Sequence, residues 1–174
     1  IATYKKWRDV LQQGTFYRGR SADVYEWTCV SADKTKAVGM MLRKLFDANT
    51  HYEQYQPKGL DEDVKYLFYN RELTFNLKEF GGLVNQVSPI HIKMNSLMHE
   101  VIAKVVKMPG EKECCVSKGK LLMQSGVKLK QGFGATGYSE DIRFSQDFSS
   151  RMYFMEKVEE EEDDLDALLG GIGD

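Results

Sequence analysis

The chain has 174 residues, of which 42% are hydrophobic, 29% charged and 11% aromatic, and its formal net charge is −2. This composition predicts one globular domain with a sizeable core, and it excludes collagen-like, low-complexity and membrane-spanning sequences. No run approaches the roughly 18 apolar residues of a spanning helix, and we expect no secretion signal. Because the sequence starts at Ile1, we expect it to be a segment of a longer polypeptide.

The cysteines are Cys29, Cys114 and Cys115, an odd number with two adjacent in sequence. Such a set suits neither a disulfide framework nor a zinc site, because both need paired cysteines at characteristic spacings. We therefore expect structural thiols in a reducing, cytoplasmic compartment.

Acidic residues concentrate at the end of the chain. Seven of the 26 acids lie between Glu159 and Asp166, which leaves the other residues with a formal charge of +5. This positive charge is small, and the lysines are scattered among acidic residues. We therefore predict no nucleic-acid partner. Repulsion between like charges favours a solvated acidic tail over residues 159–174. In a less favoured alternative, Leu165, Leu168 and Leu169 form one amphipathic turn that docks on a partner.

A helix is predicted over residues 3–13. Its apolar residues recur at spacings of three and four and line one face: Tyr4, Trp7, Val10 and Leu11. We expect Thr3 to cap the start of this helix and Gly14 to supply a left-handed conformation at its end.

Short strand patterns separated by turns follow this helix. Residues 24–30 and 37–42 flank the turn at 31–34 and predict a hairpin, and residues 64–69 predict a further strand. Residues 150–158 predict a closing strand. Its alternating side chains place Met152 and Phe154 on one face and Arg151, Tyr153 and Met155 on the other.

Helical spacing returns at residues 96–107, after a cap at Asn95 or Ser96 and before the stop at Pro109 and Gly110. A shorter helical turn at residues 120–125 ends at Gly126. Many short strands with few helices predict a mainly β fold, an antiparallel sheet or sandwich, and argue against a parallel α/β core.

No motif predicts a metal, cofactor or catalytic site. His51, His91 and His99 are too far apart to suggest a metal cluster, and His99 is interpreted as a surface imidazole. The glycine-rich segment with Gly132, Gly134 and Gly137 lacks the surroundings of a phosphate-binding loop and is interpreted as a turn.

Aromatic residues are numerous enough to supply stacking platforms for sugars. The candidates are Phe16, Tyr17, Trp27, Tyr52, Tyr55, Phe148 and Tyr153. Most of them are also needed to fill a β core, so the favoured interpretation of each single residue is packing. On these grounds alone the chain is a soluble, mainly β domain without a self-contained active site.

Five local strings, taken in order, resemble the end of the catalytic barrel and the C-terminal domain of family 36 glycoside hydrolases, the bacterial α-galactosidases. They are Tyr4-Lys5, Arg8, Gln12, Gly14 and Phe16-Tyr17-Arg18; Trp27, Val30-Ser31, Asp33-Lys34 and Ala37; Lys58-Gly59-Leu60-Asp61 with Tyr66; Gly119, Leu122, Gly126 and Val127; and Asp147-Phe148-Ser149-Ser150-Arg151 with Tyr153. The segment 70–113 is longer than the short linker that many family members have at this place. In this respect it resembles the larger cytoplasmic enzymes of Gram-positive bacteria. Residues 159–174 match no part of the family pattern.

The resemblance implies three parts: residues 1–18 as the last helix of a (β/α)8 barrel with its linker, residues 19–158 as an antiparallel β-sandwich of Greek-key type with one inserted helix, and residues 159–174 as the acidic tail. It implies a parent enzyme that hydrolyses terminal α-galactosyl residues, as in melibiose or raffinose, and a C-terminal domain that is itself inactive. The expected partners are the catalytic barrel of the parent chain and further copies in a homo-oligomer, with no nucleic acid and no membrane. We expect the α-galactoside substrate to bind to the parent enzyme and not to this domain alone.

The two catalytic carboxylates of this retaining family come from barrel strands before this segment, so no residue here is expected to be catalytic. The segment Lys6-Trp7-Arg8-Asp9 is similar to the Lys-Trp-Asp motif that contains the family's nucleophile. Here Arg8 occupies the position of the nucleophilic aspartate, so we do not expect Asp9 to be a nucleophile. The acidic pairs at 61–63 and 140–141 are interpreted as solvated charges.

Two other classes of function stay open at this stage: a carbohydrate-binding module that holds galactosides directly, and a stand-alone interaction domain whose acidic tail recruits a partner. If the first helix belongs to a barrel, its apolar face is left uncovered in this segment. We then expect Trp7 and its neighbours to form an exposed patch that promotes self-association.

Overall fold

The computed structural model describes residues 1–20, 24–45, 53–71, 74–109, 112–129 and 148–159. Several residues discussed above lie outside this described part: His51, Tyr52, Gly132, Gly134, Gly137, Glu140, Asp141 and residues 160–174. The interpretations attached to them stay predictions.

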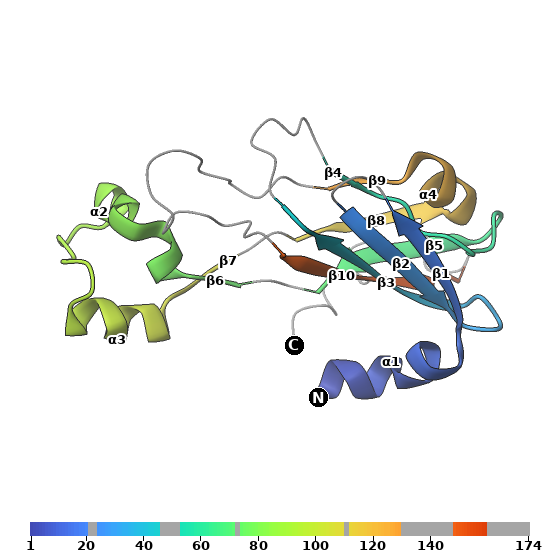
Figure 1. Ribbon diagram of the computed structural model, residues 1–174, viewed down its shortest axis with the longest axis horizontal. Coiled ribbons are helices and arrows are strands. Elements are labelled where there is room, and N and C mark those ends of the chain that lie inside the picture. The colour runs from blue at the N-terminus through green and yellow to red at the C-terminus, as the bar shows by residue number, and fades with distance from the viewer. Residues whose placement is uncertain (21–23, 46–52, 72–73, 110–111, 130–147, 160–174) are drawn as a thin grey trace.

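The centre of the fold is a six-stranded sheet in which all neighbouring strands are antiparallel (Figure 1). Its order is β1 (Thr15–Arg20), β2 (Val24–Val30), β3 (Lys36–Arg43), β10 (Ser150–Lys157), β5 (Lys65–Asn70) and β8 (Cys114–Lys118). The predicted hairpin is the β2–β3 pair, and the predicted closing strand, β10, lies between β3 and β5. The mainly β, antiparallel fold is therefore confirmed.

One face of the sheet is covered by a second layer made of β4 (Glu53–Tyr55), β9 (Val127–Leu129) and α4 (Gly119–Ser125). β4 and β9 pair only with each other among the described strands. The core between the layers contains Val30, Ala37, Met41, Tyr55, Leu60, Tyr66, Phe68, Leu122, Leu129, Tyr153 and Met155. The alternation predicted for β10 holds, because Tyr153 and Met155 enter this core while Phe154 faces the other way.

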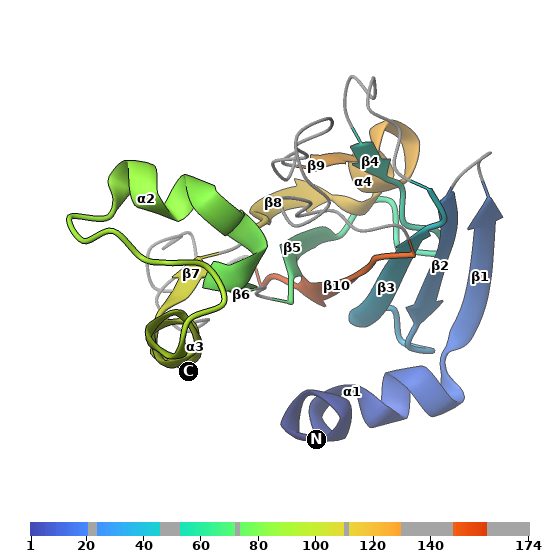
Figure 2. The same cartoon turned by 60° about the vertical axis from the view of Figure 1, so that its left-hand side comes forward.

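The opposite face of the sheet carries α1 (Ala2–Gln13), as Figure 2 shows. Trp7 and Val10 pack there on Val38 and Phe154, and the rings of Trp7 and Phe154 stack with centroids 4.9 Å apart. Trp7 is only 2% exposed. The prediction of an exposed patch around Trp7 is therefore wrong, because the sheet itself supplies an apolar face that covers this helix.

Both predicted ends of the first helix are also wrong. Ile1 holds the N-cap position without a side-chain hydrogen bond, and Thr3 lies inside the helix. Gly14 is extended, with φ −72° and ψ 163°, because the chain passes directly from α1 into β1. A Cβ at Gly14 would approach the carbonyl oxygens of Val10 and Val30 to 2.5 and 2.7 Å, so close packing explains this glycine.

A small helical module is inserted between β5 and β8 and projects from the sheet in Figure 1. It consists of β6 (Thr74–Asn76), η1 (Leu77–Leu83), α2 (Val84–Val87), α3 (Leu97–Val105) and β7 (Lys107–Pro109). Its own small core contains Leu77, Val84, Ile92 and Ala103. The predicted helix at 96–107 is confirmed with a shorter end, because β7 pairs with β6 instead of continuing the helix.

Ser96 caps α3, since its Oγ accepts a 3.2 Å hydrogen bond from the backbone N–H of His99. The interpretation of His99 as a surface residue is wrong, because the residue is only 2% exposed. Its Nδ1 accepts a 3.3 Å hydrogen bond from the backbone N–H of Asn95 and so helps to shape the entry to the helix. The short helical turn near 120–125 is confirmed as α4, which ends at Gly126 with φ +67°.

Candidate functional site

The described residues offer little that could form a metal or redox centre. They contain no group of three or more His, Cys, Asp or Glu side chains arranged to hold a metal ion. Within the same residues, no helix is both long and apolar enough to pass through a membrane. Cys29 is buried and donates a 3.0 Å hydrogen bond from Sγ to the carbonyl oxygen of Val10, so this thiol ties β2 to α1.

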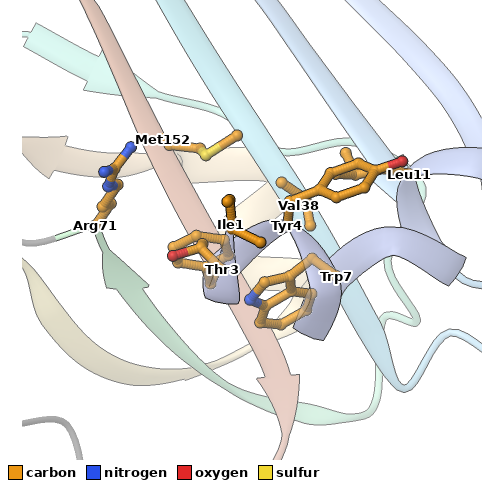
Figure 3. A pocket seen from close by; sticks show the side chains of 9 residues that line it. Ile1, Thr3, Tyr4, Trp7, Leu11, Val38, Arg71 and Met152 are labelled. Atoms are coloured by element: carbon orange, nitrogen blue, oxygen red, sulfur yellow. The ribbon is translucent and has the colours of Figure 1, made fainter. Parts of the chain in front are cut away.

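A pocket of about 180 Å³ lies along one flank of α1, between the helix and the sheet (Figure 3). Its lining residues are Ile1, Thr3, Tyr4, Trp7, Leu11, Val38, Arg71, Met152 and Phe154. Seven of the nine side chains are apolar or aromatic, and Arg71 carries the one charge. No carboxylate, imidazole or thiol belongs to this lining.

A compact polar cluster lies on the other flank of α1. The Lys6 ammonium donates hydrogen bonds to Glu156 Oε1 at 2.9 Å and to the Tyr69 hydroxyl at 3.3 Å, and Tyr69 donates to the same carboxylate oxygen at 2.5 Å. Burial alone would raise the pKa of Glu156, but the hydrogen bonds from Tyr69 and Lys6 and the charges of Lys6 and Lys36 lower it below its usual value. Burial and the neighbouring carboxylate raise the pKa of Tyr69.

This cluster holds α1 on the sheet. It contains a single carboxylate, whereas a retaining glycosidase needs two carboxyl groups about 5 to 5.5 Å apart. The side chain of Asp9 is 87% exposed beside Arg8. The carboxylate of Asp61 accepts a 3.1 Å hydrogen bond from the backbone N–H of Asp63, as in a turn. The expectation that no residue of this chain is catalytic stays a prediction, and the acids described here lie in surroundings compatible with it.

The aromatic candidates separate into two groups. Tyr55 and Tyr153 are fully buried and stack with centroids 4.6 Å apart, so they fill the core. Phe148 is 70% exposed and Phe16 is 49% exposed. Phe16 lies 5.3 Å from the ring of Trp27, on the outermost pair of strands.

Sequence reasoning missed the pocket, and in particular Arg71 and Met152. These two residues come from segments about 80 positions apart that meet only because β10 pairs with β5. The spacing that identified Tyr4, Trp7 and Leu11 as one helix face was the available signal, and it identified one wall of the pocket.

Comparisons with known proteins agree with this architecture. The sequence profile of the glycosyl hydrolase family 36 C-terminal domain matches residues 24–155. No curated protein sequence matches the chain. Among solved structures, the family 36 α-galactosidase AgaA of Geobacillus stearothermophilus is similar at 26% identity and a TM-score of 0.53, over 90% of this chain and 15% of that enzyme.

Two other solved structures show the same fold at lower identity. The α-galactosidase AgaB of Geobacillus stearothermophilus has 24% identity and a TM-score of 0.53, over 90% of this chain and 14% of that enzyme. The α-galactosidase of Lactobacillus brevis has 20% identity and a TM-score of 0.56, over 91% of this chain and 16% of that enzyme. The chain thus spans about 15% of the length of such enzymes. With more than half of its residues matched by the family profile, the chain belongs to glycoside hydrolase family 36 as a representative of its C-terminal domain.

Proposed function

We propose that this chain is the C-terminal β domain of an α-galactosidase and that it is not catalytic by itself. The observation that carries the proposal is the family match over residues 24–155, which covers five of the six sheet strands and the second layer and leaves out β1. The pocket beside α1 supports it, because its lining offers an apolar binding surface and no pair of carboxylates. The hydrolysis of terminal α-galactosyl residues, as in raffinose or melibiose, then belongs to the parent enzyme.

The proposed contribution of the domain is to support the catalytic barrel and the assembly of subunits. The geometry of α1 supports this role, because the helix is bound to the sheet by Trp7 on its underside and by Lys6 at its flank. Only Gly14 separates α1 from β1, so a barrel connected through α1 would be held in a fixed orientation. Residues 1–18 as the last barrel helix, a homo-oligomer and a bacterial, cytoplasmic enzyme are parts of the same proposal.

The first experiment measures hydrolysis of p-nitrophenyl α-galactoside by the 174-residue chain alone and by the same chain joined to the preceding part of its parent polypeptide. We expect turnover only in the joined form. Turnover by the chain alone would overturn the proposal, because a carboxylate of this domain would then be catalytic.

The supporting role is tested in the joined form by Trp7→Ala, with Leu121→Ala as the control because Leu121 is 60% exposed on α4. We expect Trp7→Ala to lower the melting temperature and to disturb subunit assembly, measured by light scattering, while Leu121→Ala changes neither. Equal behaviour of the two variants would contradict the role proposed for α1.

A second candidate function, direct carbohydrate binding, is favoured by the half-exposed ring of Phe16 beside Trp27. Arg18 lies 5.4 Å from the centre of the Phe16 ring and could donate hydrogen bonds to sugar hydroxyls. Saturation-transfer NMR with raffinose or galactose distinguishes this function. Transfer that disappears in Phe16→Ala would support it, and no transfer to the unaltered chain would remove it.

A further inference from the structure

The inserted module leaves one face of α3 uncovered. Leu97, Val101 and Val105 are 83%, 61% and 77% exposed, and Met98 is exposed as well. At 100° per residue, these four side chains fall within an arc of about 100° around the helix. Ala103, on the opposite side, is buried in the small core of the module. The helix α3 therefore has an outer apolar face in addition to the inner one that the module buries.

The outer face is a continuous row of side chains. Leu97, Val101 and Val105 follow one another at a spacing of four residues, which forms one ridge along the helix. Contiguous apolar surface marks an interaction site, whereas apolar residues exposed singly do not. In Figure 1 the module lies at one end of the long axis of the molecule, and α1, through which the proposed barrel is connected, lies beside the sheet. The two surfaces therefore belong to different parts of the molecule.

The ridge is symmetric about its middle residue. Val101 lies four residues from Leu97 and from Val105, about 6 Å along the axis in each direction. A second copy of α3, turned by a twofold axis that passes through Val101, brings its Val105 onto Leu97 and its Leu97 onto Val105. The two Val101 side chains meet at the axis. The ridge thus fits an identical ridge when the two helices are antiparallel.

The charged residues beside the ridge favour the same arrangement. Glu100 and Lys104 are exposed on one flank, about 1.5 Å and 4.5 Å from Val101 in opposite directions along the axis. In the antiparallel pair, the partner's Lys104 lies about 3 Å along the axis from Glu100, and symmetry repeats this pairing. A parallel pair would place the charged flank against the apolar flank of the partner. Glu100 also meets Lys78 of its own module at 3.6 Å, and half of its side chain stays exposed.

The area of this contact is small. The nine residues of α3 extend over about 13.5 Å, and a helix is about 10 Å wide. A specific and stable protein complex buries about 800 Å² on each partner, several times the outline of such a helix. Two copies held by α3 alone would therefore associate weakly.

We propose that the outer face of α3 is a contact between two copies of this chain, in which antiparallel helices pack through Leu97, Val101 and Val105. The contact is weak by itself and adds to other contacts between subunits. In the parent enzyme the inference rests on the homo-oligomer of the proposed function, and it names one of its contact surfaces. The tests measure association without substrate, so their failure would leave the proposed α-galactosidase activity untouched.

The first test is sedimentation equilibrium of the 174-residue chain at concentrations up to about 1 mM, a range that detects weak dimers. We expect Val101→Glu to raise the dissociation constant at least about tenfold, because the substitution enters the symmetric contact twice. Leu121→Glu is the matched control, since Leu121 is 60% exposed on α4, and it should leave the dissociation constant unchanged. Circular dichroism checks that both variants fold.

The charges are tested by exchanging them. Glu100→Lys and Lys104→Glu, each alone, should weaken association about three- to tenfold, because each removes two exposed ion pairs between the copies. The double variant Glu100→Lys, Lys104→Glu restores opposite charges across the contact and should recover most of the association. It does not restore the pair with Lys78, so the recovery reports on the contact between copies.

The orientation of the helices is tested by disulfide cross-linking. Val101→Cys lies on the proposed twofold axis, where packed helices bring two Cα atoms within the roughly 4.4–6.8 Å that a disulfide spans. We expect this variant to cross-link to itself at least about ten times faster than Leu121→Cys, and Leu97→Cys to cross-link with Val105→Cys when the two are mixed. Mass spectrometry of the linked peptides separates these products from any that involve Cys29, Cys114 or Cys115.

Four results would overturn the proposal. The first is a chain that stays monomeric up to about 1 mM. The second is equal association of Val101→Glu and Leu121→Glu. The third is self-linking of Leu97→Cys as fast as that of Val101→Cys, which would indicate parallel helices. The fourth is loss of the Val101→Cys cross-link when the chain is joined to the preceding part of its parent polypeptide, which would assign this face to another domain of the parent.

Discussion

The hydroxyl group of Tyr55 lies directly over the backbone of Gly39, in the middle of β3, so that no room is left for a Cβ at this position. Tyr55 is fully buried and donates a 2.9 Å hydrogen bond to the carbonyl oxygen of Trp27. It also shares a 2.8 Å hydrogen bond with Thr28 Oγ1. Burial, the largest influence, raises the pKa of this phenol. Gly39 thus allows the β4–β9 layer to approach the sheet closely.

We expect Gly39→Ala to destabilise the fold by about 2–3 kcal/mol, because the added methyl group displaces the Tyr55 ring from its hydrogen bonds. Chemical denaturation followed by circular dichroism measures the free energy of unfolding. Gly82→Ala is the matched control, since a Cβ there meets nothing within 4 Å. A loss at Gly39 no larger than at Gly82 would show that Tyr55 can move without cost.

Trp7→Ala should cost about 3–5 kcal/mol, the range for deleting a large buried aromatic side chain. The loss arises because the ring stacks on Phe154 and closes the apolar face of the sheet. Denaturation and limited proteolysis within residues 2–13 measure the effect. Tyr4→Ala, at a half-exposed position of the same helix, should cost less than about 1 kcal/mol. Similar losses for the two variants would mean that α1 is not anchored through Trp7.

Local patterns were sufficient to predict much of the fold. Alternation placed Phe154 and Tyr153 on opposite faces of β10, and helical spacing placed Trp7 on the apolar face of the first helix. These signals depend on side chains a few residues apart, which the backbone geometry relates directly. The two-sheet sandwich of Greek-key type stays a prediction, since the second layer described contains β4 and β9 with α4.

Contacts between residues that are far apart in the chain could not be predicted from local sequence patterns. Pairing of β10 with both β3 and β5 joins segments more than 80 residues apart, and no local pattern specifies it. For the same reason the partner of Trp7 was expected to be a barrel, although it is the sheet of this chain. His99 was misjudged because a histidine beside Glu100 suggested an exposed imidazole, whereas the inserted module buries it and its Nδ1 accepts a hydrogen bond from the backbone N–H of Asn95.

Cys29 should be the thiol most protected from modification in the native protein. It is 2% exposed and its Sγ donates to the carbonyl oxygen of Val10, and burial raises the pKa of this thiol. Cys114 and Cys115 are half-buried. We expect a disulfide reagent, followed by mass spectrometry, to label Cys29 only as fast as the protein unfolds. Labelling of Cys29 and Cys115 at equal rates under native conditions would contradict this expectation.

Asp33 should titrate with a pKa of about 2 in the folded protein. The hydroxyl of Ser31 donates to its carboxylate at 2.6 Å, and the backbone N–H and hydroxyl of Thr35 donate at 3.1 and 2.9 Å. An unfolded aspartate has a pKa of about 3.9, so the stability from this turn is present above pH 4 and is lost as the pH falls toward 2.

NMR titration of the Asp33 carboxyl carbon measures this pKa directly. In Ser31→Ala the pKa of Asp33 should rise toward its ordinary value. The substitution removes the hydrogen bond from the Ser31 hydroxyl, which lowers this pKa more than any other contact. Asp33→Asn should show a weaker fall of stability between pH 4 and pH 2 than the unaltered chain. An ordinary pKa in the unaltered chain would show that these donors do not hold the carboxylate in solution.

Glu156 connects the pH dependence of the fold to the anchoring of α1. Its carboxylate accepts hydrogen bonds from Lys6 and Tyr69, and although burial opposes the effect, the pKa of Glu156 lies below its usual value. Near the ordinary glutamate pKa of about 4.3, the unfolded state therefore binds more protons than the folded state. The stability that the ionised Glu156 contributes is complete above that pH, and it is lost as the pH falls through the folded-state pKa.

The variant Glu156→Gln should accordingly be less stable than the unaltered chain above pH 5, by about 1 kcal/mol for a partly exposed pair. The difference should shrink below pH 4, because protonation of Glu156 removes the same charge in the unaltered chain. Glu100→Gln is the matched control, since its carboxylate meets the exposed Lys78 at 3.6 Å and should contribute less than about 0.5 kcal/mol. A difference for Glu156→Gln that does not change between pH 3 and pH 7 would show that the carboxylate acts through its shape and not through its charge.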